Sequence, residues 1–92
     1  MNLVYKALAD PTRRKILELL RRRDMSAGEL AMYFDLAKPT LSRHFAVLRE
    51  AELIHSEKRG TTITYSLNVS VLEEALLALM SAFHISHGSD NT

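Results

Sequence analysis

The side chains best suited to bind a ligand, a cationic Arg43 among small polar neighbours, lie between Lys38 and Glu50. At 100° per residue, a helix here turns Leu41, Phe45 and Leu48 to one side, as expected of a face that packs on a core. The other side is small and polar except for Arg43, whose guanidinium can donate two hydrogen bonds to guanine O6 and N7. Such a helix fits a DNA major groove about 12 Å wide. The residues predicted to meet DNA from this segment are Lys38, Pro39, Thr40, Ser42, Arg43 and His44.

The neighbours of Arg43 have several possible roles. Thr40 and Ser42 can reach phosphates or base edges, and Thr40 can also offer its methyl group to thymine. For His44, helix packing or a hydrogen bond to phosphate is favoured over catalysis. Ala37 precedes the helix without a capping side chain, so its free N–H groups, together with Lys38, are expected to bind either a DNA phosphate or water.

A second basic site follows at Lys58, Arg59 and Gly60. Cations at the tip of a hairpin can lie along the phosphates or enter the minor groove, which adds a salt-dependent contribution to affinity. The alternative is that these are solvated charges of an ordinary turn. Lys58 and Arg59 are the predicted DNA contacts here.

Several other kinds of chemistry are excluded or disfavoured. The chain has no Cys, so it has no thiol nucleophile, iron–sulfur cluster or Cys-ligated zinc. No Ser, His or Asp lies in a nucleophile-elbow, metal-triad or Gly-rich phosphate pattern. An enzyme is therefore not predicted, and neither is a cofactor.

Two histidines leave one weak metal candidate. His84 and His87 stand three residues apart and could share one side of a helix, with Glu73 or Glu74 of a second chain completing a site. Two His near a polar C-terminus are more often simply solvated. No metal site is predicted beyond this weak possibility.

Length and charge place these residues in one small domain. The chain has 92 residues, 47 % apolar and 25 % charged, which predicts a single globular domain over 1–92. All 12 Lys and Arg lie in residues 1–60, where they outnumber the acids by four; residues 61–92 carry a charge of −3. No signal peptide or run of 18 apolar residues is present, so a cytoplasmic protein without membrane insertion is predicted.

Four short helices are predicted to position the basic segment. Apolar spacing indicates a helix over 2–9, which Asp10 and Pro11 end; Asp10 then caps a second helix over 11–23. Ser26 and Glu29 form a capping box that opens a third helix, 27–34. The fourth helix covers 38–51, and the third and fourth together form a helix-turn-helix candidate.

The rest of the chain reads as a hairpin and a last helix. Alternating residues predict strands over 53–58 and 61–67, with Arg59 and Gly60 as the turn. Ser70 and Glu73 predict a capping box for a helix from Val71 to about Ile85. The predicted fold class is mainly α with a small β-hairpin.

This last helix is apolar on more than one side, and one small core cannot cover two faces. A second copy of the chain is the predicted cover, with the first helix assisting; complete burial within a monomer is the less favoured alternative. The predicted dimer interface consists of Leu3, Val4, Leu8, Leu72, Leu76, Leu79, Met80 and Phe83.

These motifs, in this order, resemble the ArsR/SmtB winged-helix repressors. The resemblance rests on DPTRRKILELL at residues 10–20, KPTLSRHFAVLR at 38–49, and Gly60 followed by ITYSL at 63–67. It implies a winged helix-turn-helix homodimer joined through its first and last helices. It also implies a recognition helix at 38–51, a wing at 53–67 and a dimerisation helix at 71–87.

Three departures from the family pattern are visible. Residues 31–36 lack the Cys-x-Cys motif of members that bind thiophilic metals. Val71 and Glu73 stand where zinc-binding members have Asp-x-His, so His84 and His87 match only half of that site. Glu52 replaces a frequent Gly, and because it adopts a left-handed C-cap less easily, we expect this helix to end differently and to aim the wing differently.

The sequence thus predicts a DNA-binding transcriptional regulator, most simply a repressor on a palindromic operator bound as a homodimer. A protein or small-molecule inducer of unspecified chemistry is compatible with this interpretation. The alternative is a protein-interaction module whose last helix or wing binds a regulatory protein, with DNA binding secondary. Gel shifts against random duplex and the salt dependence of binding separate the two.

Overall fold

The computed structural model describes residues 2–85 as a mainly helical fold with a three-stranded antiparallel sheet of order β1-β3-β2. None of the helices in this range is long and apolar enough to cross a lipid bilayer. Along the chain the elements are α1 (Asn2–Leu8), α2 (Pro11–Arg22), β1 (Met25–Ser26), α3 (Ala27–Ala31), α4 (Lys38–Glu50), β2 (Ile54–Arg59), β3 (Thr62–Leu67) and α5 (Val69–Ala82).

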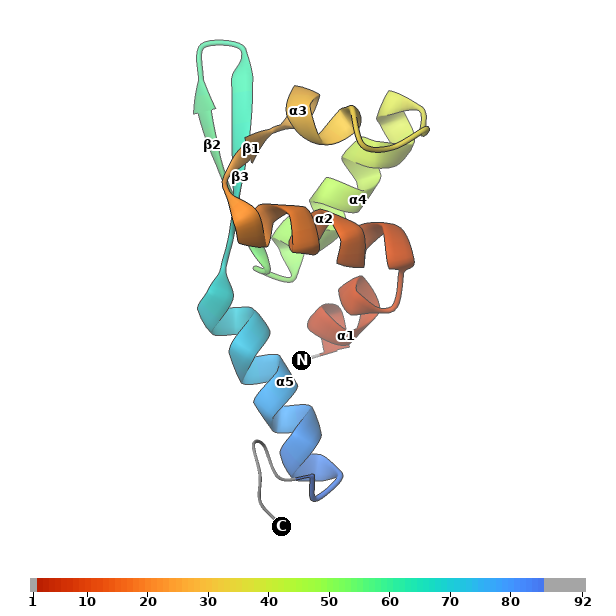
Figure 1. Ribbon diagram of the computed structural model, residues 1–92, viewed down its shortest axis with the longest axis vertical. Helices are drawn as coiled ribbons and strands as arrows, with labels where there is room; N and C mark the ends of the chain where they lie inside the picture. Colours follow the sequence, from red (N-terminus) through yellow and green to blue (C-terminus); the bar gives the residue numbers. More distant parts are fainter. Residues whose placement is uncertain (1, 86–92) are drawn as a thin grey trace.

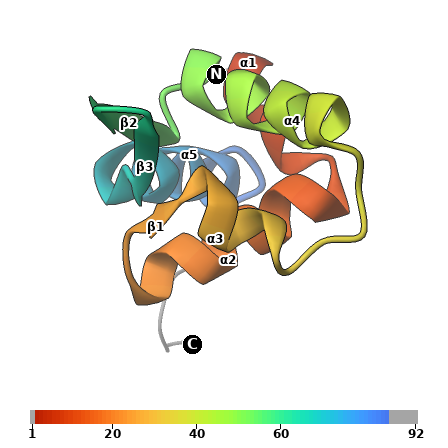
Figure 2. The same cartoon turned by 90° about the horizontal axis from the view of Figure 1, so that it is seen from above.

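The molecule is elongated, with principal extents of 49 × 21 × 21 Å. Helices α1 to α4 and the sheet form one body, which we call the head, and the β2–β3 hairpin projects from it (Figure 1). Helix α5 leads away from the head toward the end opposite the hairpin tip (Figure 1). Viewed along the long axis, α1 lies beside α4 (Figure 2), and the two helices are in contact.

The core of the head joins all of its elements. Its fully buried large side chains are Ile16, Leu19, Leu30, Leu48, Leu53 and Ile54. The predicted stripe of Leu41, Phe45 and Leu48 is buried, as expected. Phe45 packs on Tyr65 of β3 with ring centroids 4.6 Å apart. Burial raises the pKa of the Tyr65 hydroxyl above its ordinary value of 10.0, against the opposing charge of Arg49.

The sheet and the third helix differ from the prediction in three details. Helix α3 ends at Ala31, and its chain continues in turns through Phe34. A third strand, β1, pairs Met25 with Tyr65 of β3; two residues are too short to show alternation in a sequence. Arg59 is the last residue of β2 and pairs with Thr62, so the turn is Gly60 and Thr61. Gly60 takes φ +62°, the left-handed conformation that glycine adopts freely.

The prediction for the last helix was wrong at both ends. Helix α5 begins at Val69 rather than Val71, and the Ser70–Glu73 capping box is not formed because Asn68 occupies the N-cap position. The helix ends at Ala82, before the predicted 85–87. His84 follows in the left-handed region with φ +56°, where its N–H bonds to the Ser81 carbonyl. His84 is therefore not on the helix, and His87 lies outside the described residues.

Helix α4 ends at Glu50, and the expectation that Glu52 makes this helix end differently was wrong, whereas the expectation about the aim of the wing stays a prediction. Glu52 does take the left-handed conformation, with φ +61°. Its N–H donates to the Arg49 carbonyl at 2.9 Å, and the N–H of Leu53 donates to the Leu48 carbonyl at 3.0 Å. These two bonds form a Schellman motif, the helix ending that glycine usually provides. The buried side chain of Leu53 holds the chain in this conformation despite the steric cost to Glu52.

Candidate nucleic-acid interface

The outward side of α4 is open and polar. Pro39, Ser42 and Arg43 are exposed, and Thr40 is half-buried at the edge. The Arg43 side chain makes no hydrogen bond or ion pair with any other residue of the described range 2–85. Its guanidinium therefore keeps all of its donors for a ligand. Helix α4 can bring a two-pronged donor to a base edge without first breaking a contact of the free protein.

A hollow of about 230 Å³ lies between α3 and α4. Leu41 and Phe45 are among its apolar walls, and Lys38 and Ser42 line it from α4. Lys38 and Ser42, predicted to contact DNA from one helix, thus meet at one edge of that helix. The hollow leaves both side chains room to reorient toward a backbone phosphate.

The start of α4 differs from the starts of the other two helices of the helix-turn-helix region. Asp10 caps α2, accepting the N–H groups of Thr12 at 2.7 Å and Arg13 at 3.2 Å. Ala37 precedes α4 with no side-chain bond to the helix, as the sequence predicted. The first N–H groups of α4 consequently carry partial positive charge with no protein side chain as acceptor.

The Asp10 cap is ionised in the folded protein. Partial burial favours the neutral acid, but the backbone N–H groups of Arg13 and Thr12, with the charge of the Arg13 guanidinium, outweigh it. Together they hold the pKa of Asp10 below its ordinary value of 3.8. A lowered folded pKa stabilises the protein above the unfolded pKa, and this contribution is lost as the pH falls through the folded value.

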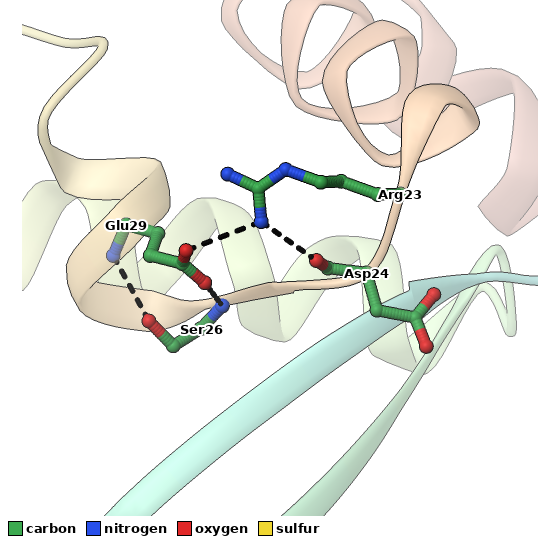
Figure 3. Close-up of polar contacts among 4 residues, drawn as sticks. All are labelled: Arg23, Asp24, Ser26 and Glu29. Atoms are coloured by element: carbon green, nitrogen blue, oxygen red, sulfur yellow. Dashed lines mark hydrogen bonds and ion pairs between the residues drawn. The ribbon is translucent and has the colours of Figure 1, made fainter.

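The predicted capping box of α3 is present. The N–H of Glu29 donates to Ser26 Oγ at 3.0 Å, and the N–H of Ser26 donates to Glu29 Oε1 at 2.9 Å (Figure 3). Arg23 binds the other oxygen of Glu29 at 3.1 Å (Figure 3). The bond from the Ser26 N–H, followed by that from Arg23, lowers the pKa of Glu29 below 4.5. The Arg23 side chain thus holds the capping carboxylate of Glu29 and is not a free cation.

Arg13 is a structural residue that the sequence did not single out. Its guanidinium donates to the carbonyls of Ala7 at 2.9 Å and Lys6 at 3.0 Å, and lies 3.1 Å from Nδ1 of His44. It therefore ties the end of α1 to α4. Because arginine only donates, this contact is a hydrogen bond in the tautomer in which Nδ1 of His44 accepts and Nε2 carries the ring proton. The structure thus shows the packing role considered for His44 and leaves Nε2–H as its remaining donor.

The two cations of the hairpin tip lie on opposite faces of the hairpin. Lys58 pairs with Ile63 and shares the face of Tyr65, which packs on α4. Arg59 pairs with Thr62 on the other face, where its guanidinium is 3.3 Å from Glu57. The two side chains of that ion pair are 82 % and 66 % exposed, so the pair is weak and easily exchanged for a phosphate.

The predicted dimer residues of α1 and α5 differ in how far their side chains are exposed. Val4 is buried in the core of its own chain and is not available to a partner, which corrects that prediction. Leu8, Leu72, Leu79 and Met80 are half-buried. Leu3, Leu76 and Phe83 are exposed. The prediction omitted three further exposed side chains, Val69, Leu77 and Ile85.

A groove of about 620 Å³ runs along this side of α5. Among the residues of α5 only Ala75 is fully buried, whereas Leu76 is 48 % exposed. The helix therefore presents a nearly uninterrupted apolar face to whatever lies outside the chain. The residues lining the groove are Val69, Leu72, Glu73, Leu76, Leu77 and Met80.

No cluster of three or more His, Cys, Asp or Glu side chains among residues 2–85 is placed to hold a metal ion. Of the weak metal pair, His84 is exposed after the end of α5. The helical spacing that suggested a shared metal is absent, since the chain has left the helix before His84.

Comparison with known proteins gives a consistent result. Residues 10–56 match the family model described as bacterial regulatory protein, arsR family. The chain is 49 % identical over 76 residues to the transcriptional repressor SdpR of Bacillus subtilis (strain 168), covering 83 % of this chain and 84 % of that protein. It is 36 % identical over 73 residues to the arsenical resistance operon repressor of Staphylococcus xylosus, covering 79 % and 70 %.

The fold has close counterparts among solved structures. The crystal structure of the ArsR family transcriptional regulator RHA00566 superposes with a TM-score of 0.77 at 31 % sequence identity. The superposition covers 90 % of this chain and 89 % of that one. The likeness therefore includes the helix-turn-helix, the hairpin and α5 together.

Proposed function

This chain belongs to the ArsR family of bacterial regulatory proteins and is a DNA-binding transcriptional regulator rather than an enzyme, and we propose that it represses transcription by binding a palindromic operator as a homodimer. The observation that carries the proposal is the outward side of α4, where Arg43 is exposed and without a partner among residues 2–85. The alternative of a protein-interaction module is not favoured, because the relatives compared are named as transcriptional repressors.

In this proposal α4 is the recognition helix, and its residues make different contacts with the DNA. Arg43 reads guanine with two hydrogen bonds. Thr40 and Ser42 contact phosphates or base edges from the two flanks of Arg43. His44 donates its Nε2–H to a phosphate while Arg13 holds its other nitrogen. Pro39 lets the start of the helix approach the groove closely.

The hairpin is the wing and supplies charge rather than base recognition. Lys58 and Arg59 bind phosphates on either side of the hairpin, so each adds to the affinity for any duplex. On binding, Arg59 leaves its weak ion pair with Glu57 and binds a phosphate of the DNA backbone.

The groove on α5 is proposed to be covered by α5 of a second copy, with Leu3 and Leu8 of α1 at the edge. Leaving side chains such as Leu76, Leu77 and Val69 about half exposed is unfavourable in water. A two-fold axis would place the same face of both copies together and bury these side chains at once.

Two-fold symmetry has a geometric consequence for the operator. The two recognition helices would enter successive major grooves on one side of the duplex, about 34 Å apart, so the half-sites should form an inverted repeat. The regulator would act in the cytoplasm, where bacterial DNA is found.

The experiment that tests this function measures binding of the purified protein to duplexes. Fragments enriched from genomic DNA are compared with random duplex of equal length by fluorescence anisotropy at several salt concentrations. We expect enriched fragments to bind at least about 1,000-fold more tightly than random duplex. Equal affinity for both at every salt concentration would contradict the proposal.

The uncapped start of α4 offers a second test. We propose that the N–H groups there, with Lys38, bind a DNA phosphate. The Ala37→Ser substitution supplies a cap and should stabilise the free protein by about 1 kcal/mol. It should stabilise the DNA complex less, because the phosphate already satisfies these groups. Denaturant melts with and without DNA measure both effects, and equal stabilisation of the two states would refute the idea.

A further inference from the structure

Asn68 stands at the single-residue junction between the hairpin and α5. Its side-chain Nδ2 donates to the backbone carbonyl of Glu52 at 2.9 Å. Its backbone N–H donates to the carbonyl of Leu53, also at 2.9 Å. Both acceptors belong to the turn that directly follows α4. One residue at the start of α5 is therefore bonded twice to the end of the recognition helix.

The side chain of Asn68 is committed to this contact at the expense of its own helix. Asparagine is among the preferred N-cap residues, because its oxygen can accept an N–H of the first helical turn. Asn68 occupies the N-cap position of α5 and makes no such bond. It is turned to Glu52 instead, so the link to α4 replaces the local cap.

The other end of the link is rigid. Glu52 is held at φ +61° by the Schellman motif at the end of α4, which also fixes the direction of its carbonyl. The next two residues, Leu53 and Ile54, are fully buried. The Glu52 carbonyl therefore moves with α4, and Asn68 binds a fixed point of the head.

Few other contacts hold α5 to the head, where Val71 and Leu72 pack partly buried against the core. Of its own residues only Ala75 is fully buried, and α1 is the element of the head against which it packs most. The helix projects from the head beyond this point (Figure 1). Because Asn68 lies where α5 leaves the head, its two bonds to the turn after α4 set the position and the direction in which the helix starts.

We propose that Asn68 is a positioning residue that fixes the angle between α4 and α5 and thereby selects the spacing of operator half-sites. The proposal rests on the homodimer proposed above. Helix α5 has 14 residues and is about 21 Å long. A tilt of about 10° over this length displaces its far end by about 3.6 Å, close to the rise of about 3.4 Å per base pair. A small loss of angular control therefore changes which spacing the dimer accepts.

The test uses the full chain with Asn68→Ala and Asn68→Asp. Aspartate keeps the oxygen that can cap α5 but cannot donate to the Glu52 carbonyl, so it breaks the link while favouring the helix. Ser70→Ala is the matched control, since Ser70 is exposed in the first turn of α5. Circular dichroism and sedimentation establish that each variant is folded and in the same oligomeric state as the wild type.

The readout is the ratio of dissociation constants for the selected operator and for operators with one base pair added to or removed from the centre. One base pair rotates a half-site by about 35°, so a rigid dimer should discriminate by about 10-fold or more. We expect the wild type and Ser70→Ala to keep this ratio, and both Asn68 variants to reduce it to about 3-fold or less. General destabilisation lowers all affinities together and does not change the ratio.

The outcomes are distinguishable. Folded, dimeric Asn68 variants that keep the wild-type ratio would overturn the role of Asn68 and leave the proposed function intact. A wild-type protein that stays monomeric and binds a single half-site would overturn the homodimer and the role of Asn68 with it.

Discussion

Helices α4 and α5 are nearly equal in length, yet they relate to the rest of the chain in opposite ways. Helix α4 buries Leu41, Phe45 and Leu48 against its own head and exposes a polar side with Arg43. Helix α5 buries Ala75 and exposes Leu76, Leu77 and other apolar side chains. Helix α4 is thus packed on its own chain with a polar side left for a ligand, whereas α5 leaves apolar side chains exposed in the single chain.

Charge separates the two regions in the same way. Every Lys and Arg of the chain lies in residues 1–60, and the three carboxylates of residues 61–92 have no Lys or Arg beside them in that segment. Helix α5 therefore offers no Lys or Arg to DNA, whereas α4 carries Lys38, Arg43 and Arg49. Substitutions in the two regions should consequently affect different measurements.

The largest effect is expected for Leu76→Glu. Leu76 lines the groove on α5 and is exposed in a single chain, so the substitution spares the core of the head. In a symmetric dimer it removes two apolar contacts of about 1.5–3 kcal/mol each and buries two charges. The dissociation constant of the dimer, measured by sedimentation, should rise by at least about 100-fold. Affinity for the operator should be lost in parallel.

Ser70→Glu is the control, because it places the same charge on an exposed part of α5 outside the groove. It should leave both the dimer and operator binding unchanged. If Leu76→Glu remains a dimer, α5 is covered by something other than its own copy and the contrast between the helices loses its explanation.

The next effect belongs to α4. Arg43→Ala should cost roughly 1–3 kcal/mol per half-site and relax base preference at one position of each half-site. Arg43→Lys keeps the charge but lacks the two-pronged donor, so it should lose the preference while retaining more affinity. Binding to a set of single-base operator variants measures both quantities. Full selectivity in the alanine variant would remove Arg43 from its assigned role.

A smaller and less selective effect is expected at the hairpin. Arg59→Ala should weaken binding to operator and random duplex alike, and should lower the slope of log affinity against log salt by about one per protomer. Lys15→Ala is a matched control on α2, because Lys15 is also paired with a glutamate at 3.3 Å. A change confined to the operator would show that Arg59 reads bases.

The smallest effect concerns the junction between the two regions. Glu52→Gly should stabilise the protein by about 0.5–1 kcal/mol in denaturant melts at fixed protein concentration, because glycine adopts the left-handed conformation without strain. Glu50→Gly, two residues earlier at the end of α4, should destabilise it instead, by up to about 1 kcal/mol. Destabilisation by Glu52→Gly would mean that the Glu52 side chain makes a contact worth more than the backbone strain.

The head could be predicted from the sequence because its signals are local. The order Asp10–Pro11 and the Ser26–Glu29 pair specify helix starts within three residues, and the stripe of Leu41, Phe45 and Leu48 repeats at helical spacing. Such features depend on neighbours along the chain. Tertiary packing has little opportunity to override them.

Two of the missed features depend on residues far apart in the sequence. Arg13 bonds to His44 across 31 positions, and Asn68 bonds to Glu52 across 16. At Glu52 the general preference for glycine misled the prediction, because a buried Leu53 and two backbone bonds stabilise the strained conformation. The capping box expected from Ser70 and Glu73 is not formed, because α5 already starts at Val69. Only Asn68 separates this helix from the end of β3.

In the proposed assembly α5 joins two copies so that two α4 helices meet one duplex. Its most direct test is the selection of binding sites from a random duplex library by the purified protein, followed by the stoichiometry of the complex. We predict an inverted repeat with half-site centres about 34 Å apart, bound by two chains. A single half-site bound by one chain, or no enriched sequence at all, would contradict this assembly.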